Sequence, residues 1–477
     1  MLNNPYFKII TKSLQNNIFI IFYIVISFSM IFYHECWLDE AHAYVIAKYK
    51  NIWEIFQHAR YDGHPILWHL LLKATILLKL PYVSIQIINT TFNCIAVWLV
   101  INYSPFHRIF RYLLVLGYFI LFEYNIIARN YSLFMLLLFL IAIIYESIEK
   151  KRYSYIILLL LLAFTHFFGL ILSILIFTYS LISEDLIKKR RWFIPNLSAC
   201  LGYLLICILL FRSPNEASLI PHDQSISFES IISQLSTILD SLLLIPDYFY
   251  SFEIINIVSF SKLLISISVF GGLIYYMIRK KQLLFILIIY LISILIFRLF
   301  IYSGGIWNIG VIWLAIIFFS WISPTSNLKS IQLSFLSTLT IIILIFHTIL
   351  GFKWMYLDRN YDFSSSKNYA TYINSYSKTH PQLSIYFNFN DSWWGESIVP
   401  YLDDNIKIYG IKLVPAQGKL NTKNCLILVD NYFNFEKENN EEILFSSSEI
   451  ELRGKCNFLI KKMDGESGQV PLTSVPN

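Results

Sequence analysis

Charged residues are scarce in this chain of 477 residues, and their scarcity argues against a soluble fold. Asp, Glu, Lys and Arg make up 14% of the sequence, whereas hydrophobic residues make up 56%. A soluble globular protein carries roughly 25% charged residues. The mean hydropathy is +0.58, and the apolar residues gather in runs long enough to cross a bilayer, which takes about 20 helical residues. The composition therefore predicts a polytopic membrane protein.

Several motifs of soluble enzymes and of zinc proteins are also missing. The sequence has no Gly-rich phosphate loop, no serine nucleophile elbow and no HExxH pattern. The six cysteines show no CxxC or Cys/His spacing, so a zinc site is unsupported. The spacing of Cys425 and Cys456 leaves open whether they form a disulfide. The net charge of +6 does not indicate a nucleic-acid partner, because most basic residues flank apolar runs.

The apolar runs predict about eleven membrane-spanning helices of an all-α membrane domain. The predicted spans are Asn17–Tyr33, Ser84–Tyr103, Ile109–Glu123, Tyr131–Ile148, Tyr153–His166, Gly169–Ser183, Phe193–Phe211, Ser261–Ile278, Leu283–Ile301, Gly305–Ile322 and Ile331–Gly351. A further stretch, Ile66–Leu80, is short and contains two lysines, which suits a re-entrant or interfacial segment. If this stretch is instead a full span, the Arg108 cluster moves to the outside.

Lys and Arg in short loops favour the cytoplasm, and their positions predict the orientation. The clusters are Lys8/Lys12, Arg108/Arg111, Lys150–Arg152, Lys188–Arg191, Arg279–Lys281 and Lys329. With all six inside, the N-terminus is cytoplasmic and everything after Phe352 is extracytoplasmic. We therefore expect an integral, multi-pass protein of a bacterial inner or plasma membrane, in contact with membrane lipids.

Three parts follow from this pattern. Residues 1–352 form the membrane domain, and its first external loop is 34–65. Residues 353–464 form a small extracytoplasmic α/β domain, and 465–477 form a disordered tail. The elements predicted outside the membrane are an amphipathic interfacial helix at Glu229–Leu244, a helix at Ser364–Tyr376, and strands at Ser384–Asn388, Lys407–Ile411, Cys425–Val429 and Asn457–Lys461.

The first external loop carries the densest group of ionisable residues, His34-Glu35-Cys36-Trp37-Leu38-Asp39-Glu40-Ala41-His42. A carboxylate at the membrane surface can accept a proton from a hydroxyl or an amine, or hold a divalent cation. Asp39 and Glu40 are the main candidates, and Glu35 is the less marked acid. Acidic residues also favour the first turn of a helix, so a purely structural role stays open.

Further candidates are basic or imidazole side chains predicted on the outer side. Arg60 and His64 lie where the loop returns to the membrane. Arg129 is an isolated arginine on the predicted outer side, where Lys and Arg are normally rare. The planar guanidinium group of an arginine can bind two phosphate oxygens at once. The structural alternative is that the side chain only reaches toward the membrane interface. His166 lies at the tip of a tight hairpin, where the alternative is a simple turn. Arg298 is alone near the outer end of its run and could bind a phosphate or pair with a carboxylate.

Two function classes fit such a membrane protein. A proton-coupled transporter often shows a series of acids at the bilayer midplane, inverted repeats or paired broken helices, and none is evident in this sequence. We therefore favour an enzyme acting at the outer surface. The alternatives are a transporter or flippase of a lipid-linked glycan or small solute, and a non-catalytic scaffold.

Short motifs add a resemblance to a known family. Trp37-Leu38-Asp39-Glu40-Ala41, followed by Gly63-His64-Pro65, resembles the first-loop signature of polytopic GT-C glycosyltransferases, in particular the protein O-mannosyltransferase and lipid A aminoarabinose transferase branch. Ala128-Arg129-Asn130-Tyr131-Ser132-Leu133 resembles the later Arg-x-Tyr segment of that family, and Thr165-His166 its hairpin. The resemblance is best over the first two hundred or so residues. Trp307-Asn308 stands where similar bacterial sequences lead us to expect a basic pair.

The resemblance implies a GT-C-like fold and transfer of a sugar from a polyprenyl-phosphate donor to a glycan, lipid or protein acceptor on the extracytoplasmic side. It implies that Asp39 is the general base of a single inverting displacement and that Glu40 helps to orient the substrate. The substrate-binding residues that we expect are Arg60, His64, Arg129, Tyr131 and His166. The sequence identifies no cofactor, and the Asp-Glu pair is compatible with metal-free catalysis or with one divalent ion.

Overall fold

The computed structural model describes residues 5–62, 65–183, 192–211, 228–243, 281–301, 305–322, 335–388, 394–411, 425–430, 443–446 and 458–462. The chain divides into two compact units. Unit 1 comprises Met1–Ser29, Phe56–Trp68 and Ile87–Met355, and unit 2 comprises Met30–Ile55, His69–Gln86 and Tyr356–Asn477. The predicted span Ser261–Ile278 and the predicted tail 465–477 lie outside the described residues.

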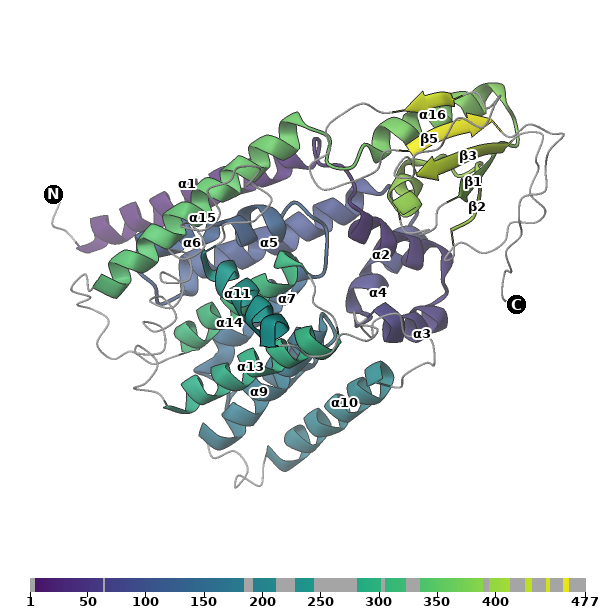
Figure 1. The fold of residues 1–477 in the computed structure, drawn as a ribbon. Helices are drawn as coiled ribbons and strands as arrows, with labels where there is room; N and C mark the ends of the chain where they lie inside the picture. The colour runs from purple at the N-terminus through teal and green to yellow at the C-terminus, as the bar shows by residue number, and fades with distance from the viewer. Residues whose placement is uncertain are drawn as a thin grey trace. The chain divides into compact units, whose positions relative to one another are not determined.

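Unit 1 is a bundle of apolar helices (Figure 1). Helix α8 packs against α7, α9 and α10, and α13 packs against α9 and α14. The helices that lie wholly or largely in unit 1 are α1 (Pro5–Met30), α3 (Ile52–Asp62), α5 (Val83–Tyr103), α6 (Arg108–Val115), α7 (Tyr131–Tyr145), α8 (Arg152–Ala163), α9 (Phe167–Ser183), α10 (Phe193–Phe211), α11 (Phe228–Leu243), α13 (Lys281–Phe300), α14 (Ile306–Ile322) and α15 (Phe335–Asn360).

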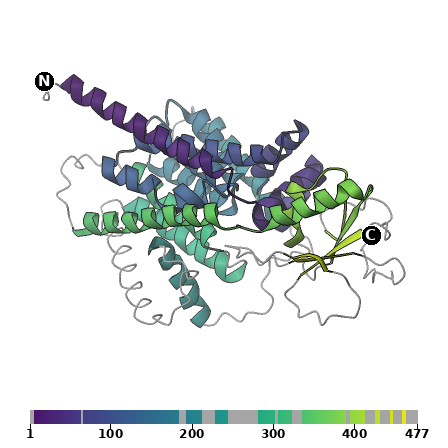
Figure 2. The ribbon, with the colours of Figure 1, turned by 90° about the horizontal axis from the view of Figure 1, so that it is seen from above.

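Four of these helices are long and apolar enough to cross a membrane: Ser13–Met30, Val83–Tyr103, Leu283–Phe300 and Thr340–Asn360. Helices α1 and α15 are the longest, with 26 residues each, and Figure 2 shows both at full length in purple and green. Shorter apolar helices occupy most of the other predicted spans that the structure describes. The expectation of a helical membrane protein is confirmed, whereas the number of crossings and their direction stay predictions.

The short stretch Ile66–Leu80 contains an 11-residue helix, α4 (Leu67–Leu77). At 1.5 Å per residue such a helix is about 16 Å long, roughly half the thickness of the hydrocarbon core of a bilayer. The amine of Lys73 donates a hydrogen bond of 2.8 Å to the carbonyl of Lys50. The length favours the re-entrant or interfacial placement of this stretch over a full span.

The predicted span Ile109–Glu123 is not one continuous helix. Helix α6 ends at Val115, and a π-helical turn, η1 (Phe119–Glu123), follows after a break. A break inside an apolar bundle leaves backbone carbonyls without helical partners, and such groups need other donors where water is absent. The carbonyls of this segment that side chains of unit 1 reach are those of Ile120, Leu121, Tyr124, Asn125 and Ile127.

Buried amide side chains of α5 supply most of these donors. Asn89 Nδ2 lies 2.9–3.3 Å from the carbonyl oxygens of Tyr124, Asn125 and Ile127. One helical turn later, Asn93 Nδ2 donates to the carbonyl of Ile120 at 2.9 Å, and the Tyr23 hydroxyl also reaches it at 3.0 Å. Both asparagines are fully buried. Polar residues inside a predicted span thus hold the irregular backbone that precedes α7.

Substituting Asn89 tests this account. Asn89→Ala removes a donor that three buried carbonyls share, so we expect the free energy of unfolding to fall by about 1–3 kcal/mol. Thermal unfolding of the purified protein in detergent measures the loss. Asn102→Ala is the matched control, because Asn102 is an exposed asparagine on the same helix that bonds only to the carbonyl of Trp98. Equal stability of the two variants would contradict the proposed role of Asn89.

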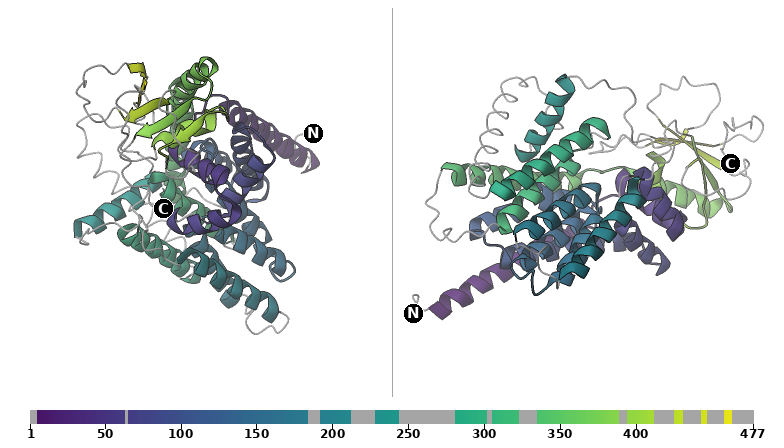
Figure 3. Two further views of the ribbon diagram at one scale, coloured as in Figure 1. Left: turned by 90° about the vertical axis from the view of Figure 1, so that its right-hand side faces the viewer. Right: turned by 90° about the horizontal axis from the view of Figure 1, so that it is seen from below.

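Unit 2 contains a five-stranded mixed sheet in the order β2-β1-β3-β5-β4. Strand β1 pairs in parallel with β2 and β3, whereas β5 is antiparallel to β3 and β4. Both views of Figure 3 show α16 (Ser366–Thr379) beside the strands. The strands are β1 (Ser384–Asn388), β2 (Lys407–Tyr409), β3 (Cys425–Asp430), β4 (Ile443–Ser446) and β5 (Phe458–Lys462).

The predicted elements of the C-terminal part agree with the structure within a few residues at each end. Strand β4 and a 3₁₀ helix, η5 (Trp394–Tyr401), were not predicted. Strand β4 was not predicted because it has only four residues and follows an acidic stretch. The η5 helix was not predicted because it contains Pro400, and a proline argues against a helix. Cys425 lies on β3, and Cys456 is outside the described residues, so their pairing stays open.

Candidate functional site

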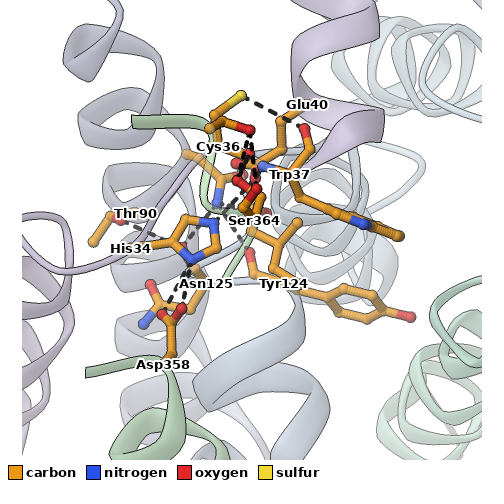
Figure 4. A network of polar contacts seen from close by, with 12 residues as sticks. His34, Cys36, Trp37, Glu40, Thr90, Tyr124, Asn125, Asp358 and Ser364 are labelled. Atoms are coloured by element: carbon orange, nitrogen blue, oxygen red, sulfur yellow. Dashed lines mark hydrogen bonds and ion pairs between the residues drawn. The ribbon is translucent and has the colours of Figure 1, made fainter. Parts of the chain in front are cut away.

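A buried ion-pair cluster holds the segment that leads into α2 (Leu38–Tyr49), as Figure 4 shows. His34 Nε2 lies 3.0 Å from Glu40 Oε2, and His34 Nδ1 lies 3.0 Å from both carboxylate oxygens of Asp358. The three side chains are almost completely inaccessible to solvent. Both ring nitrogens face carboxylates, so a protonated imidazole can donate to both sides at once.

The charge of His34 follows from these neighbours. Burial alone would lower the pKa of His34, but the carboxylates of Asp358 and Glu40 outweigh it and raise the pKa to about 10. The imidazole is therefore a cation at neutral pH. A buried charge without a partner is very unfavourable, so each member of the cluster depends on the others.

Glu40 is fixed by a second donor as well. The backbone N–H of Trp37 donates to Glu40 Oε2 at 2.8 Å. Trp37 immediately precedes α2 and Glu40 is its third residue, which is the half of a capping box that a glutamate provides. Glu40 is only 2% exposed. These contacts give Glu40 a role at the start of the helix, and its predicted role in orienting substrate stays a prediction.

The backbone between His34 and α2 has two further anchors within unit 2. The N–H of Cys36 donates to the hydroxyl of Tyr401 at 2.7 Å. The hydroxyl of Ser364 donates to the carbonyl of Cys36 at 2.8 Å (Figure 4). The loop is thus held by side chains that follow it by more than three hundred residues in the sequence.

Helix α2 itself is fastened to the C-terminal part of unit 2. His42 Nδ1 lies 2.7 Å from Glu396 Oε2, and both side chains are buried or nearly so. Near the end of the helix, Lys48 Nζ lies 2.9 Å from the exposed carboxylate of Asp404. Together with the His34 cluster, these contacts fix α2 along its whole length.

Asp39 is the second residue of this fixed helix. Its side chain is half-buried, whereas Glu35 and Glu40 are buried. The N-terminal end of a helix stabilises a carboxylate in its charged form. Among Glu35, Asp39 and Glu40, Asp39 is therefore the acid that keeps partial access to solvent, at the start of a helix that the His34 cluster holds.

Glu35 has a different environment. It is 7% exposed, and its Oε2 is without a hydrogen-bond partner among the described residues. Burial raises the pKa of Glu35, while a hydrogen bond from the backbone of Ser364 and the charge of Lys367 oppose the rise. The sequence marks Glu35 less strongly than Asp39 and Glu40, and it does not reveal this buried environment.

Three of the predicted substrate-binding residues come together within unit 1. The guanidinium carbon of Arg129 lies 5.2 Å from the ring centre of Tyr131, and the ring centres of Tyr131 and His166 are 5.4 Å apart. Arg129 and His166 are both buried. The start of α7 and the turn before α9 therefore bring Arg129, Tyr131 and His166 to one place, and their role in substrate binding stays a prediction.

Trp307-Asn308, at the start of α14, joins the same group. The guanidinium carbon of Arg129 lies 5.9 Å from the Trp307 ring. The Tyr131 hydroxyl donates to Asn308 Oδ1, and the Tyr124 hydroxyl donates to the carbonyl of Trp307 at 2.8 Å. Where a basic pair was expected, this chain has an indole near the guanidinium and an amide that holds Tyr131.

The other predicted residues are His64, Arg60 and Arg298. His64 and the side chain of Arg60 lie outside the described residues. Arg298 Nε donates to Gln234 Oε1 at 2.8 Å, so this isolated arginine contacts a neutral amide of α11. Among the described residues, no cluster of three or more His, Cys, Asp and Glu side chains is arranged to hold a metal ion.

Sequence reasoning missed Asp358, Ser364, Glu396 and Tyr401. Asp358 carried one usable signal, since an acid at the outer end of an apolar run usually has a partner. Glu396 and Tyr401 lie in the unpredicted η5 helix, and nothing in their local pattern pointed to the first loop. The pairing of His34 with Asp358 spans 324 residues of sequence.

No protein-family model matches this chain, and no curated protein or solved structure is detectably similar to it. The class of the protein therefore rests on its own features. The apolar helices define a helical membrane protein. The first loop after α1 and the C-terminal α/β part form one compact unit, in which a buried imidazolium holds an acidic helix start.

The buried cluster makes a prediction about stability. Replacing the shared cation, as in His34→Gln, leaves the buried carboxylates of Glu40 and Asp358 uncompensated and should reduce the free energy of unfolding by about 3–5 kcal/mol, whereas Asp358→Asn leaves His34 paired with Glu40 and should cost less. Lys48→Met, which removes an exposed ion pair from the same unit, should cost less than about 1 kcal/mol. Chemical denaturation of the protein in detergent compares the three variants.

The pH dependence has a defined sign. A raised pKa in the folded state means that the His34 contribution is complete below about pH 6.5 and is lost as the pH rises toward 10. The stability difference between wild type and His34→Gln should therefore shrink steadily between pH 7 and pH 10. A difference that stays constant over this range would show that His34 is not charged in the folded protein.

Proposed function

We propose that this protein is a membrane glycosyltransferase that moves a sugar from a polyprenyl-phosphate donor to an acceptor on the extracytoplasmic side. The observation that carries the proposal is the placement of Asp39. It is a half-buried carboxylate on the first turn of a helix that the His34 cluster and Glu396 hold in place. A general base needs such a fixed position and access to its substrate.

In the proposed reaction, Asp39 accepts the proton of an acceptor hydroxyl as that oxygen attacks the anomeric carbon of the donor sugar. A bond forms between the acceptor oxygen and the anomeric carbon, while the bond from that carbon to the phosphate oxygen breaks. The polyprenyl phosphate leaves with the bonding electron pair. Attack opposite to the leaving group inverts the configuration of the sugar in one step.

The group in unit 1 supports the donor side of the proposal. Arg129 has the planar fork that suits phosphate oxygens, and the rings of Tyr131 and Trp307 lie near its guanidinium. We assign Arg129 to the phosphate of the donor, with Tyr131 and His166 as its neighbours in binding. These roles come from the resemblance to GT-C enzymes and from the proximity of the three side chains.

The topology is part of the proposal. Basic clusters at the ends of apolar helices favour a cytoplasmic N-terminus and an outer C-terminal domain. Because the first loop and the C-terminal α/β part belong to unit 2, both are expected on the same side of the membrane. That side is extracytoplasmic in our assignment, where a lipid-linked sugar donor is consumed.

Substituting the base tests the chemistry. Asp39→Asn should lower the rate of sugar transfer by about 10²–10⁴-fold, because a general base typically contributes that much. The assay incubates the purified protein in nanodiscs with labelled polyprenyl-phosphate sugars and follows the release of polyprenyl phosphate. Asp404→Asn is the control, since Asp404 is an exposed acid of the same unit. Undiminished release by a folded Asp39→Ala protein would overturn the assignment.

A label at the end of α15 tests the orientation. Asn360 is exposed at the C-terminal end of this helix. In Asn360→Cys, we expect the new thiol to react with a membrane-impermeant reagent in intact cells, beyond the background of the unsubstituted protein. Labelling only after the cells are opened would place the C-terminal domain in the cytoplasm. It would thereby contradict an extracytoplasmic reaction.

A further inference from the structure

The indole of Trp307 lies beside the guanidinium group of Arg129 in unit 1. The guanidinium carbon lies over two aromatic rings, 5.2 Å from the ring centre of Tyr131 and 5.9 Å from that of Trp307. Arg129 is 8% exposed, whereas Trp307 is half-buried. The contact therefore joins a buried cation to a ring that keeps part of its surface accessible.

Hydrogen bonds tie the start of α14 to the tyrosines at the start of α7. The Tyr124 hydroxyl donates to the carbonyl of Trp307 at 2.8 Å, and the Tyr131 hydroxyl donates to Asn308 Oδ1. The rings of Tyr124 and Tyr131 are stacked, with their centres 4.8 Å apart. The backbone that carries the indole is therefore held by the same aromatic group that contacts Arg129.

Gly305 leaves the space in which the indole lies. A Cβ atom at this position would come within 2.4–2.5 Å of three carbon atoms of the Trp307 ring, a separation at which one of the two groups must shift. Gly305 does not have a positive φ, so the effect of an alanine would come from this contact and not from backbone strain. Gly305→Ala is therefore a means of displacing the ring without removing it.

An aromatic ring attracts a guanidinium group without cancelling its charge. The attraction comes from the π electrons of the ring and is stronger where water is excluded. A carboxylate in the same place would also hold the side chain, but it would compete with a phosphate for the same charge. Arginine also loses rotamer freedom when it binds a ligand, and holding it beforehand removes part of that cost. Two rings therefore suit an arginine that must be both fixed and positively charged.

We propose that Trp307 is a positioning residue that, together with Tyr131, holds the guanidinium group of Arg129 in the orientation that binds the phosphate of the lipid donor. The inference rests on the proposed function, in which Arg129 takes that phosphate. Trp307 acts through Arg129 and takes no part in proton transfer. Loss of its ring should therefore weaken donor binding and leave the rate of transfer at saturating donor largely unchanged.

The first test measures the Kd of tritiated farnesyl phosphate, a polyprenyl phosphate without a sugar, for the purified protein in nanodiscs. Arg129→Gln supplies the background that is due to partition into the lipid. Trp307→Leu should raise the Kd about fivefold, because the arginine is then ordered only on binding. Trp307→Phe keeps an aromatic ring and should stay within about twofold of wild type. In the transfer assay, Trp307→Leu should raise KM for the donor by the same factor and leave kcat within about twofold.

Trp321→Leu is the matched control for lost ring packing. Trp321 lies on the same helix, is buried, and contacts the rings of Phe106 and Phe139. This variant should lower the unfolding temperature and leave the Kd of farnesyl phosphate as in wild type. A positioning role thus changes binding, whereas a merely structural role changes stability alone.

A double-mutant cycle tests whether the position of the ring matters. Gly305→Ala should raise the Kd by about the same factor as Trp307→Leu, because it displaces the indole from Arg129. In a protein that already carries Trp307→Leu, Gly305→Ala should have no further effect, since the ring that it would displace is gone.

Three results would overturn the inference. The first is that wild type binds farnesyl phosphate no better than Arg129→Gln does. The second is that Trp307→Leu has the Kd of wild type or of Trp321→Leu. The third is that the effects of Gly305→Ala and Trp307→Leu add in full. Failure of the proposed function has a different signature, because Asp39→Asn would then leave transfer intact while the Kd values still followed the ring at position 307.

Discussion

The arrangement of unit 2 depends on one buried imidazolium. His34 follows the first long helix, Asp358 lies near the end of the last one, and Glu40 begins α2. Within unit 2, the single positive charge between two carboxylates holds the segment from His34 to the start of α2. The anchors from Tyr401 and Ser364 and the pair of His42 with Glu396 add to a geometry that this charge defines. Asp39 owes its fixed position to that geometry.

In unit 1, neutral amide side chains stabilise an irregular stretch of backbone. The chain between α6 and α7 is irregular inside an apolar bundle, and amide side chains of α5 satisfy its carbonyls. Arg129 and Tyr131 lie at the end of this irregular segment, where His166 and Trp307 contact them. A regular helix through this region would place its side chains at different positions. The grouping of Arg129 with Tyr131, His166 and Trp307 therefore depends on the break between α6 and α7.

The sequence predicted well what depends on local patterns. Helix α10 and strand β1 begin and end where their apolar runs do, because composition and periodicity decide such elements. It could not show that Ile109–Glu123 is broken, since the asparagines that stabilise the break lie on another helix. It marked Asp39, Glu40, Arg129 and His166 as candidates. It could not rank Glu35, Asp39 and Glu40 by exposure, because burial depends on tertiary packing, as in the hydrogen bond of Glu35 to the backbone of Ser364.

The charge state of His34 is the central claim, and nitrogen NMR measures it directly. In protein with ¹⁵N-labelled histidine, assigned by comparison with His34→Gln, both ring nitrogens of His34 should keep imidazolium shifts at pH 8, well above the ordinary pKa of 6.5. Asp358→Asn should lower the pKa of His34, because Asp358 makes the larger of the two carboxylate contributions that raise it. A neutral His34 in the wild-type protein at pH 8 would contradict the account of how the first loop is held.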